Sequence, residues 1–319
     1  MRIGILGTGF GQYHAKMFAS FPEVEVIGIV GRDERKTMKA ADSVGITGYT
    51  TPDALLQNPD IDAIDVCYPT SIHAEYVIRA LEQGKHVFCE TPVAYTLKDA
   101  EQMVRTAQAC NKLLLVALFD RFQSEYRYVY EYIHAGHLGS PKAAFANRRT
   151  PAIWGNLAEN IVLDLMIHDI DYLSWLLGIP RAVTARGLKN PTAGWDQVFV
   201  SLEFENINAM VEGCGIMPES FPFSTQLQVV CEEGALDVNW SFPGEHPVSD
   251  ITLYPQKGDP QKLSIPGYDP YQAECRYFVD CIQGKADPGV LGIEAAYDSL
   301  RVALAAKASL EQQGKRITL

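Results

Sequence analysis

Over the first 119 residues, short apolar runs alternate with longer amphipathic stretches. The apolar runs have the length of strands, and the stretches between them carry apolar residues at helical spacing. The predicted strands are Arg2–Leu6, Val24–Val30, Ala63–Val66, His86–Cys89 and Leu113–Val116. The predicted helices are His14–Ser20, Glu34–Val44, Ala74–Gln83 and Leu97–Cys110. Because the strands are almost continuously apolar, we expect a doubly wound parallel sheet covered on both faces.

The pattern changes after Phe119, and we expect a second domain over residues 120–319. Period-two alternation places Val198, Val200 and Leu202 on one face of a strand and Phe199 on the other. A long apolar helix is expected over residues 160–177. The other predicted elements are Ser124–Ala135, Lys142–Arg148, Ala209–Gly213, Gln226–Cys231, Ala235–Trp240, Tyr271–Ile282 and Ile293–Gln312. The fold class is therefore α/β, with a parallel N-terminal half and an α+β domain built on a mainly antiparallel open sheet.

The first predicted strand runs directly into the sequence GTGFGQYHA. Gly7 permits a tight turn, Gly9 allows the backbone to approach a pyrophosphate, and the helix N-terminus that follows attracts anions. The third glycine, Gly11, comes one position early, and Gln12 stands at the usual place. An ordinary strand-to-helix turn is the alternative. We expect residues 1–119 to form a dinucleotide-binding Rossmann domain whose turn residues contact the cofactor, namely Gly7, Thr8, Gly9, Phe10, Gly11 and Gln12.

The second predicted strand ends in the sequence IVGRDERK, where a Rossmann domain reads the adenosine ribose. An acidic residue there accepts hydrogen bonds from the ribose hydroxyls of NAD, whereas an arginine pairs with the 2′-phosphate of NADP. Gly31 and Arg32 occupy this place, so the sequence favours NADP. In the alternative, Arg32 is a solvated loop residue and Asp33 binds NAD.

Composition narrows the partners and the compartment. The 27 Lys and Arg against 39 Asp and Glu give a net charge of -12, which disfavours nucleic acid as a partner. The seven cysteines are scattered and form no CxxC pair, which indicates a reducing compartment. Neither a secretory signal nor an apolar stretch long enough for a membrane span is visible. We expect a cytoplasmic protein that does not associate with membranes.

Four segments occur in the order that is typical of one family: GTGFGQYHA, YPTSIHAEYVIRALEQGKHVFCETP, FDRFQSEYRYVYEYIHAGHLG and DLMIHDIDYLSWLLG. The chain resembles the glucose–fructose oxidoreductase, inositol dehydrogenase and MocA family of NAD(P)-dependent oxidoreductases. The resemblance implies hydride transfer between nicotinamide and a hydroxyl-bearing carbon of a sugar, cyclitol or related polyol. It also implies a homo-oligomer, a dimer or tetramer, formed through the open sheet of the second domain.

The resemblance also assigns residues that border the cofactor. Tyr68, Pro69, Thr70 and His73 would lie on a loop beside it, and Glu90 would lie below the nicotinamide ribose. A structural hydrogen bond is the alternative role for His73.

An acid/base group is needed for the hydroxyl proton, and histidine titrates near neutral pH. Asp164 and His168 are four residues apart and would share one face of a helix. The resemblance matches His168 to the acid/base residue and Asp164 to its orienting carboxylate; a His that only pairs within a helix bundle is the alternative. The family's Glu-Lys-Pro motif reads Glu90-Thr91-Pro92 here, so Thr91 replaces a cation beside the reacting oxygen.

Three functions stay open because that lysine is missing. The first is redox turnover in which Arg121, Arg148 or Arg149 supplies a cation and Trp154 borders the substrate, with the substrate held where the two domains meet. The second is an NAD-dependent glycosidase or lyase that oxidises its substrate transiently. The third is a homologue that senses a nucleotide or sugar without turnover. We predict no structural or catalytic metal, because Cys and His do not occur at ligand spacing.

Overall fold

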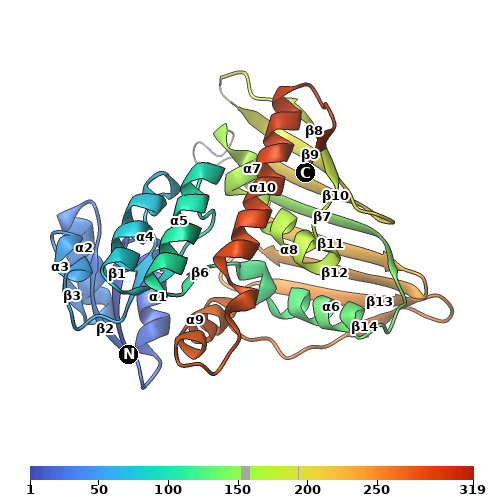
Figure 1. The fold of residues 1–319 in the computed structure, drawn as a ribbon. Coiled ribbons are helices and arrows are strands. Elements are labelled where there is room, and N and C mark those ends of the chain that lie inside the picture. Colours follow the sequence, from blue (N-terminus) through green and yellow to red (C-terminus); the bar gives the residue numbers. More distant parts are fainter. Residues whose placement is uncertain (152–158, 193) are drawn as a thin grey trace. The chain divides into compact units, whose positions relative to one another are not determined.

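The computed structural model describes residues 1–151, 159–192 and 194–319, which fall into two compact units (Figure 1). Unit 1 contains Met1–Phe119 and Asp269–Leu300, and unit 2 contains Asp120–Tyr268 and Arg301–Leu319. We expected one second domain over residues 120–319, but Asp269–Leu300 within that range belongs to unit 1. Within unit 1, the helix α9 (Pro270–Ile282) packs on α1 (Phe10–Ala19), and the backbone of Leu291 accepts a hydrogen bond of 2.8 Å from Val116.

Unit 1 is a parallel sheet of six strands in the order β3-β2-β1-β4-β5-β6. The strand order reverses between β1 and β4, which creates the switch point where such folds bind ligands. The strands are β1 (Arg2–Leu6), β2 (Glu25–Val30), β3 (Thr47–Gly48), β4 (Ala63–Val66), β5 (His86–Cys89) and β6 (Leu114–Val116). The remaining helices are α2 (Glu34–Val44), α3 (Asp53–Leu56), α4 (His73–Glu82), α5 (Leu97–Cys110) and the first part of α10 (Ile293–Glu311), with 3-10 turns η1 (Thr70–Ile72) and η4 (Pro288–Val290). The 3-10 turn η2 (Phe119–Arg121) begins at the end of this segment of unit 1 and continues into unit 2.

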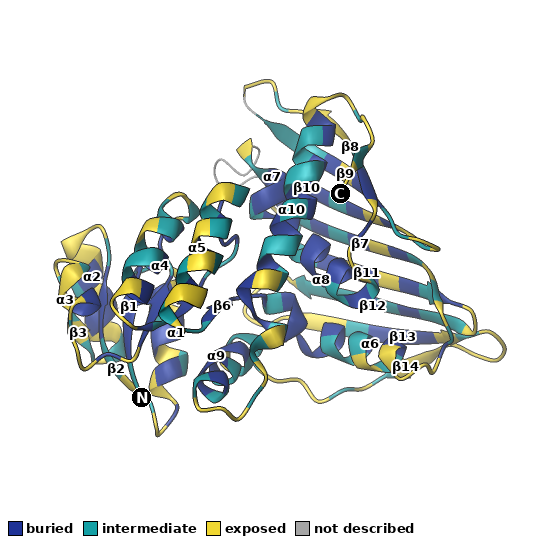
Figure 2. Cartoon of the chain, in the orientation of Figure 1, coloured by how far each residue is buried: buried dark blue, intermediate teal, exposed yellow. Residues whose placement is uncertain are grey.

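The apolar runs form these strands because each is buried by helices. Ile3, Ile5 and Leu6 of β1 and Val87 and Phe88 of β5 are all 0% exposed. Figure 2 shows the same arrangement, with buried strands and with exposed residues on the outward faces of α2, α4 and α5. The expected doubly wound parallel sheet is confirmed. The short elements β3 and α3 were not predicted, because two to four residues carry no measurable period.

Unit 2 is built on a sheet of nine strands in the order β14-β13-β12-β11-β7-β10-β9-β8-β15. Only the β7–β10 pair is parallel among the described strand pairs, so the expected mainly antiparallel sheet is confirmed. The strands are β7 (Pro141–Pro151), β8 (Ala182–Lys189), β9 (Trp195–Glu203), β10 (Asn208–Met217), β11 (Phe223–Cys231), β12 (Gly234–Phe242), β13 (Val248–Pro255), β14 (Gln261–Leu263) and β15 (Ile317–Thr318). The helices are α6 (Ser124–His134), α7 (Ile161–Asp164), α8 (Ile167–Leu177) and the second half of α10 (Ile293–Glu311).

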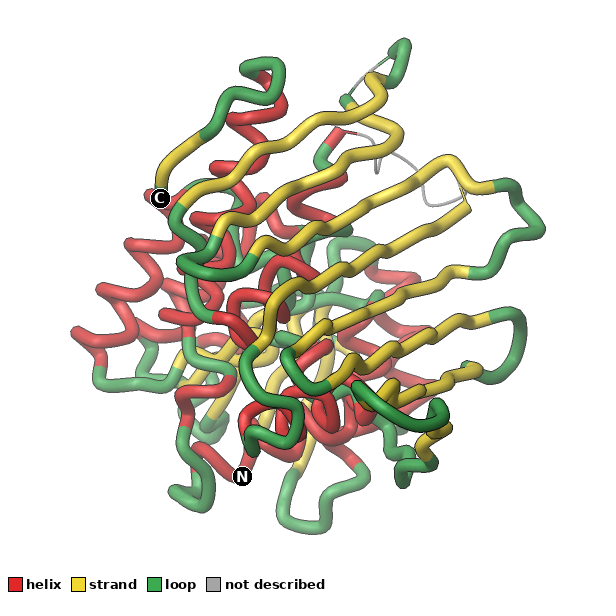
Figure 3. The backbone as a smooth tube through the Cα atoms, turned by 90° about the vertical axis from the view of Figure 1, so that its right-hand side faces the viewer, coloured by secondary structure: helices red, strands yellow, loops and turns green. Residues whose placement is uncertain are grey.

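One face of this sheet is covered and the other is open. The helices α6, α7 and α8 pack on β7, β9, β10 and β12, and Figure 3 shows the strands from the opposite, uncovered side. Val198, Val200 and Leu202 are 0% exposed beneath the helices, whereas Phe199 is 42% exposed on the open face. The predicted alternation along β9 is therefore confirmed.

The long helix expected over residues 160–177 is interrupted. It consists of α7 and α8, which are separated by Leu165 and Met166. Both of these residues are buried, at 3% and 0% exposure, so apolar packing of the turn produces an apolar pattern without a continuous helix. Within the described part of the chain, no helix has both the length and the apolar composition needed to cross a membrane.

Candidate nucleotide-binding and acid/base sites

The turn between β1 and α1 has the geometry of a backbone anion site. Gly7 has a φ of 123°, and a Cβ there would lie 2.3 Å from the carbonyl oxygen of Cys67. Gly9 precedes the first turn of α1, and a Cβ on it would meet no atom within 4 Å. Gly7 is thus required by packing inside the protein, whereas the space next to Gly9 is open for a ligand. A phosphate group bound there would face the free N–H groups of the helix N-terminus.

Gly11 explains the shifted glycine spacing. A Cβ on Gly11 would lie 2.8 Å from Cγ2 of Ile5, so this glycine allows α1 to pack closely on β1. That is the task of the third glycine in a dinucleotide-binding turn. Gln12 is therefore free to carry a side chain, and its amide donates a hydrogen bond to Ser43 in α2. Phe10 stands 54% exposed at the start of α1.

At the end of β2, Asp33 and Arg32 have different tasks. The Asp33 carboxylate caps α2 by accepting a hydrogen bond of 2.9 Å from the Lys36 backbone N–H. Arg32 is exposed and forms no ion pair with any described residue. Gly31 leaves room for Thr8, whose Cγ2 would lie 2.7 Å from a Cβ on that glycine. The cation at this strand end is thus available, whereas the carboxylate is already engaged.

The loop that follows β4 is held by His73. This imidazole is 1% exposed, and its nitrogens face the carbonyl oxygens of Tyr68, at 2.6 Å, and Pro92, at 3.1 Å. His73 therefore ties the loop after β4 to the loop after β5, a contact that corresponds to the structural alternative for this residue. Pro69 is exposed and Thr70 is half-buried, so both contribute to the surface of this loop.

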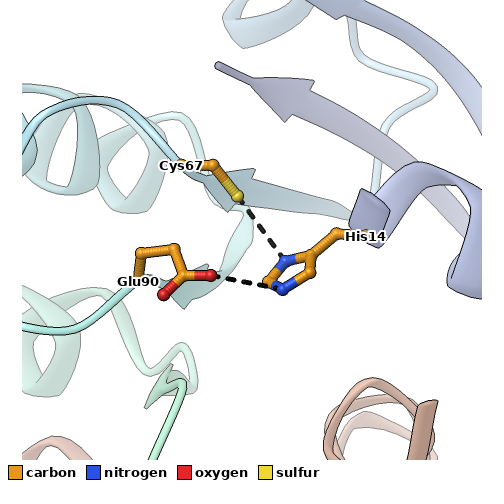
Figure 4. Close-up of side chains that lie close together, drawn as sticks. All are labelled: His14, Cys67 and Glu90. Carbon is orange, nitrogen blue, oxygen red and sulfur yellow. Dashed lines mark hydrogen bonds and ion pairs between the residues drawn. The ribbon is translucent and has the colours of Figure 1, made fainter. Parts of the chain in front are cut away.

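A buried charge cluster lies at the carboxyl ends of β4 and β5 (Figure 4). His14 Nδ1 donates a hydrogen bond of 3.1 Å to Asp65 in β4, and His14 Nε2 lies 3.2 Å from Oε1 of Glu90, which follows β5. Cys67 Sγ lies 3.3 Å from Asp65 Oδ2 and 3.5 Å from His14 Nδ1. Sequence reasoning found Glu90 but missed His14 and Asp65. A signal was present: a lone acid within an apolar strand requires a buried partner.

The cluster keeps His14 positively charged. Burial alone would lower the pKa of His14, but the carboxylates of Asp65, Glu90 and Glu274 outweigh it and raise that pKa to about 10. Burial raises the pKa of Glu90, and His14 opposes the rise. Burial also raises the pKa of the Cys67 thiol, so Cys67 is present as a neutral thiol.

A metal ion fits this cluster less well than a proton does. Ligand atoms of His14, Cys67 and Glu90 lie within 4.8 Å of one another. Cys67, however, faces Nδ1 of the ring and Glu90 faces Nε2, as Figure 4 shows. An ion shared by all three residues would have to bind one of these nitrogens and still reach the ligand on the other side of the ring. A protonated imidazole needs no such sharing, because its Nδ1 donates to Asp65 while its charge pairs with Glu90 at 3.2 Å.

In unit 2, Asp164 and His168 are the half-buried positions in an otherwise buried stretch, residues 161–170. Asp164 ends α7 and His168 is the second residue of α8, so the shared face of one helix that we expected does not exist. The break between the helices nevertheless leaves both side chains partly accessible. Burial first, and then the charge of Arg148, lowers the pKa of His168 to about 4. Its imidazole is therefore neutral at physiological pH and able to accept a proton.

Arg121 and Arg148 are buried, and each is already paired. Arg148 donates hydrogen bonds of 2.7 and 3.3 Å to Asp169, and one of 2.5 Å to Asp120. Arg121 pairs with Asp171 at 2.9 and 2.6 Å. The two arginines are 5% and 3% exposed, so their charges are neutralised by carboxylates within the core of unit 2. Their expected contact with substrate is not supported by this arrangement.

Arg149 is the third arginine that could supply a cation, and Thr91 stands where the family's motif has lysine. Arg149 follows Arg148 in β7 and points to the open face of the sheet, where it pairs with Glu212 at 2.5 Å. Thr91 is half-buried, and its backbone N–H donates a hydrogen bond of 3.2 Å to Glu90 Oε2. Trp154, the remaining expected substrate contact, lies outside the described residues.

Two family profiles match this chain. The oxidoreductase family profile with an NAD-binding Rossmann fold, GFO_IDH_MocA, matches residues 1–118, and the GFO/IDH/MocA C-terminal domain profile matches residues 126–237. The chain belongs to the GFO/IDH/MocA oxidoreductase family. It is thus an NAD-binding oxidoreductase, and the free backbone next to Gly9 is where its Rossmann unit can hold the pyrophosphate.

Two curated inositol dehydrogenases are similar to this chain over nearly its whole length. A myo-inositol 2-dehydrogenase of Thermotoga maritima is 25% identical over 98% of this chain and 97% of its own. A scyllo-inositol 2-dehydrogenase (NAD(+)) of Bacillus subtilis is 27% identical over 96% of this chain and 93% of its own. Among solved structures, a UDP-N-acetylglucosamine 3-dehydrogenase of Acidithiobacillus ferrooxidans superposes with a TM-score of 0.85 at 21% identity, covering 98% of both chains. This last likeness shows the common fold.

Proposed function

We propose that this protein transfers a hydride between NAD(P), with a preference for NADP, and a hydroxyl-bearing carbon of a sugar, cyclitol or related polyol, with His168 as the acid/base. The observation that carries the proposal is the half-buried, neutral imidazole of His168. Among residues 161–170, only His168 and Asp164 are half-buried, and the others are buried. Two inositol dehydrogenases among the relatives support the substrate class.

The nicotinamide supplies the site that accepts or returns the hydride. In the oxidising direction, the substrate carbon loses its hydride and the hydroxyl loses its proton to the imidazole of His168. The neutral state of that imidazole supports this direction, because Arg148 and burial both disfavour its protonation before substrate is present. In the reducing direction, the protonated imidazole returns the proton to the carbonyl oxygen.

The test is His168→Ala, assayed with a panel of sugars and inositols. Loss of a positioned acid/base group lowers kcat by about 100-fold to 10,000-fold, and we expect the dissociation constants of the nucleotides to stay unchanged. His134→Ala, an exposed histidine of α6, is the matched control and should keep full activity. A His168→Ala enzyme with near-normal kcat would show that another residue is the base.

The preference for NADP is supported by the two side chains at the end of β2. Arg32 is exposed without a described ion pair, whereas Asp33 is engaged as the cap of α2. Arg32→Ala should weaken NADPH binding by about 10-fold to 100-fold, which corresponds to one charged hydrogen bond, and leave NADH binding unchanged. Arg35→Ala is the control. Tighter binding of NAD that does not respond to Arg32→Ala would exclude the preference for NADP.

A second candidate is a glycosidase or lyase that oxidises its substrate transiently and regenerates the cofactor. It is favoured by one observation: the three arginines that could replace the lysine of the family's Glu-Lys-Pro motif, Arg121, Arg148 and Arg149, are each already paired with a carboxylate. Release of a free sugar from a glycoside, without net change in the cofactor, would identify this activity. Net formation of NADPH with a free polyol would identify the dehydrogenase.

The proposal includes assembly through the open face of the unit 2 sheet. Phe145 in β7 lies directly opposite Met210 in β10, and both are exposed, at 45% and 44%. Phe199 in β9 lies on the same face. Adjacent large apolar side chains on the uncovered face of a sheet favour contact with a second copy of the same face.

A further inference from the structure

The His14 cluster lies where one half of a dinucleotide is bound. Dinucleotides bind across the switch point of this fold, with one mononucleotide on each side. The end of β2, with Arg32, takes the adenosine half, so the ends of β4 and β5 face the nicotinamide half. Cys67 directly follows β4 and Glu90 directly follows β5, and His14 lies one turn into α1, after the glycine turn.

Glu90 is the member of the cluster that opens toward this side. Its side chain is 19% exposed, whereas the side chains of His14 and Asp65 are 0% exposed. A charge on Glu90 can therefore act on a bound ligand, and the deeper residues act through it. The nicotinamide ring carries a positive charge when oxidised and none when reduced, so a nearby carboxylate discriminates between the two forms.

Whether Glu90 carries a charge depends on His14. Asp65 and Glu90 lie at opposite nitrogens of one ring, where Asp65 forms a hydrogen bond of 3.1 Å and Glu90 an ion pair of 3.2 Å, so a positive charge on the ring faces a carboxylate on each side. A third carboxylate that acts on this ring comes from α9, where Glu274 is 0% exposed, and the buried thiol of Cys275 beside it interacts with Asp65 and Glu90. Without the imidazolium, Glu90 would share a buried region with Asp65 and Glu274, and their repulsion would favour its protonated form.

We propose that His14 is a positioning residue that keeps Glu90 ionised. The Glu90 carboxylate in turn strengthens the binding of the oxidised nicotinamide nucleotide relative to that of the reduced form. The inference rests on nucleotide binding by unit 1 and does not depend on the substrate or on His168.

Glu90→Gln tests the carboxylate directly, with isothermal titration calorimetry of NADP⁺ and NADPH, and of NAD⁺ and NADH, on the full chain at pH 7. The ratio of the oxidised to the reduced dissociation constant should rise by about threefold to sevenfold, which is the effect of one charge roughly 7 Å away at an effective dielectric constant of about 40 to 80. Glu82→Gln, an exposed acid in the last turn of α4, is the matched control and should leave the ratio unchanged.

His14→Gln tests the positioning role through a pH profile. In the native protein the ratio should stay flat between pH 6 and pH 9. In His14→Gln, the pKa of Glu90 should rise because the opposing charge of His14 is lost, so the ratio should become dependent on pH and approach that of Glu90→Gln as the pH falls. His86→Gln, at the other end of β5, should keep the native profile.

Two results would overturn the proposal. The first is an unchanged ratio in Glu90→Gln, whether affinity is kept or is lost equally for both redox forms, which would make Glu90 an ordinary contact. The second is one equivalent of metal that co-purifies with the native protein and is lost in His14→Gln. Glu90→Gln keeps the test decisive if His14→Gln does not fold, because Glu90 is partly exposed.

Discussion

At the scale of single residues, the buried arginines of unit 2 set the electrostatics around His168. Arg148 lies between Asp120 and Asp169, and burial raises the pKa of both carboxyls while the guanidinium opposes the rise. The same guanidinium lowers the pKa of His168. Arg148 is thus a structural cation that helps to keep the imidazole neutral, which differs from the contact with substrate that its sequence position indicated.

Arg148→Gln should therefore destabilise the protein. Loss of one partner from a buried charge pair costs about 3 to 5 kcal/mol, because Asp120 and Asp169 would be left unpaired in the core. Arg149→Gln provides the comparison, since its pair with Glu212 is partly exposed and is worth about 1 kcal/mol or less. Urea denaturation followed by tryptophan fluorescence measures both. Equal stabilities for the two variants would contradict the buried network.

His14 makes stability depend on pH in a defined direction. Its folded pKa of about 10 exceeds the ordinary histidine value, so the stabilisation is complete below the unfolded pKa of about 6.5 and is lost as pH rises toward 10. The free energy of unfolding of the native protein should fall more steeply between pH 7 and pH 10 than that of His14→Gln. Urea titrations followed by far-UV circular dichroism test this. Parallel curves for the two proteins would mean that His14 is not charged in the folded state.

The glycine turn, Arg32 and His168 could be found from the sequence because each depends on local order along the chain. The partners of Arg121 and Arg148 could not, since Asp171 and Asp169 reach them only through tertiary packing 50 and 21 residues away. The role of His14 could not be predicted for the same reason, because its partner Asp65 is 51 residues away in the sequence. Residue types that carry chemistry are thus visible in a sequence, whereas their charge state is set by neighbours that the sequence does not reveal.

At the scale of elements, periodicity predicted β4, β5, α2 and α5 with their observed bounds. It failed where apolar residues are buried in a turn between two helices. Leu165 and Met166, which separate α7 from α8, are buried, so the apolar pattern continues through a turn. Helix ends that carry caps were more visible: Asp33 caps α2, and Gly45, with a φ of 76°, ends it. These residues occupy the positions that cap preferences predict.

The Asp33 cap separates two roles for this residue. Asp33→Ala should destabilise α2 by about 1 kcal/mol, because the Lys36 N–H loses its acceptor, whereas Asp33→Asn should keep the cap. If Asp33 served the ribose of NAD instead, Asp33→Asn would weaken NADH binding while stability was preserved. Thermal unfolding and NADH titration of both variants distinguish the two roles, and we expect unchanged nucleotide binding in Asp33→Asn.

At the scale of the whole molecule, the open face of the unit 2 sheet should decide the oligomeric state. Its apolar side chains at Phe145, Phe199 and Met210 are exposed on neighbouring strands, and a charge placed among them would be buried without a partner if two copies met there. Phe145→Glu should therefore shift the protein toward monomer, whereas Gln102→Glu, exposed on α5 of unit 1, should not. Light scattering coupled to size-exclusion chromatography measures the mass of each. A native monomer, or an assembly that tolerates Phe145→Glu, would exclude this face as the interface.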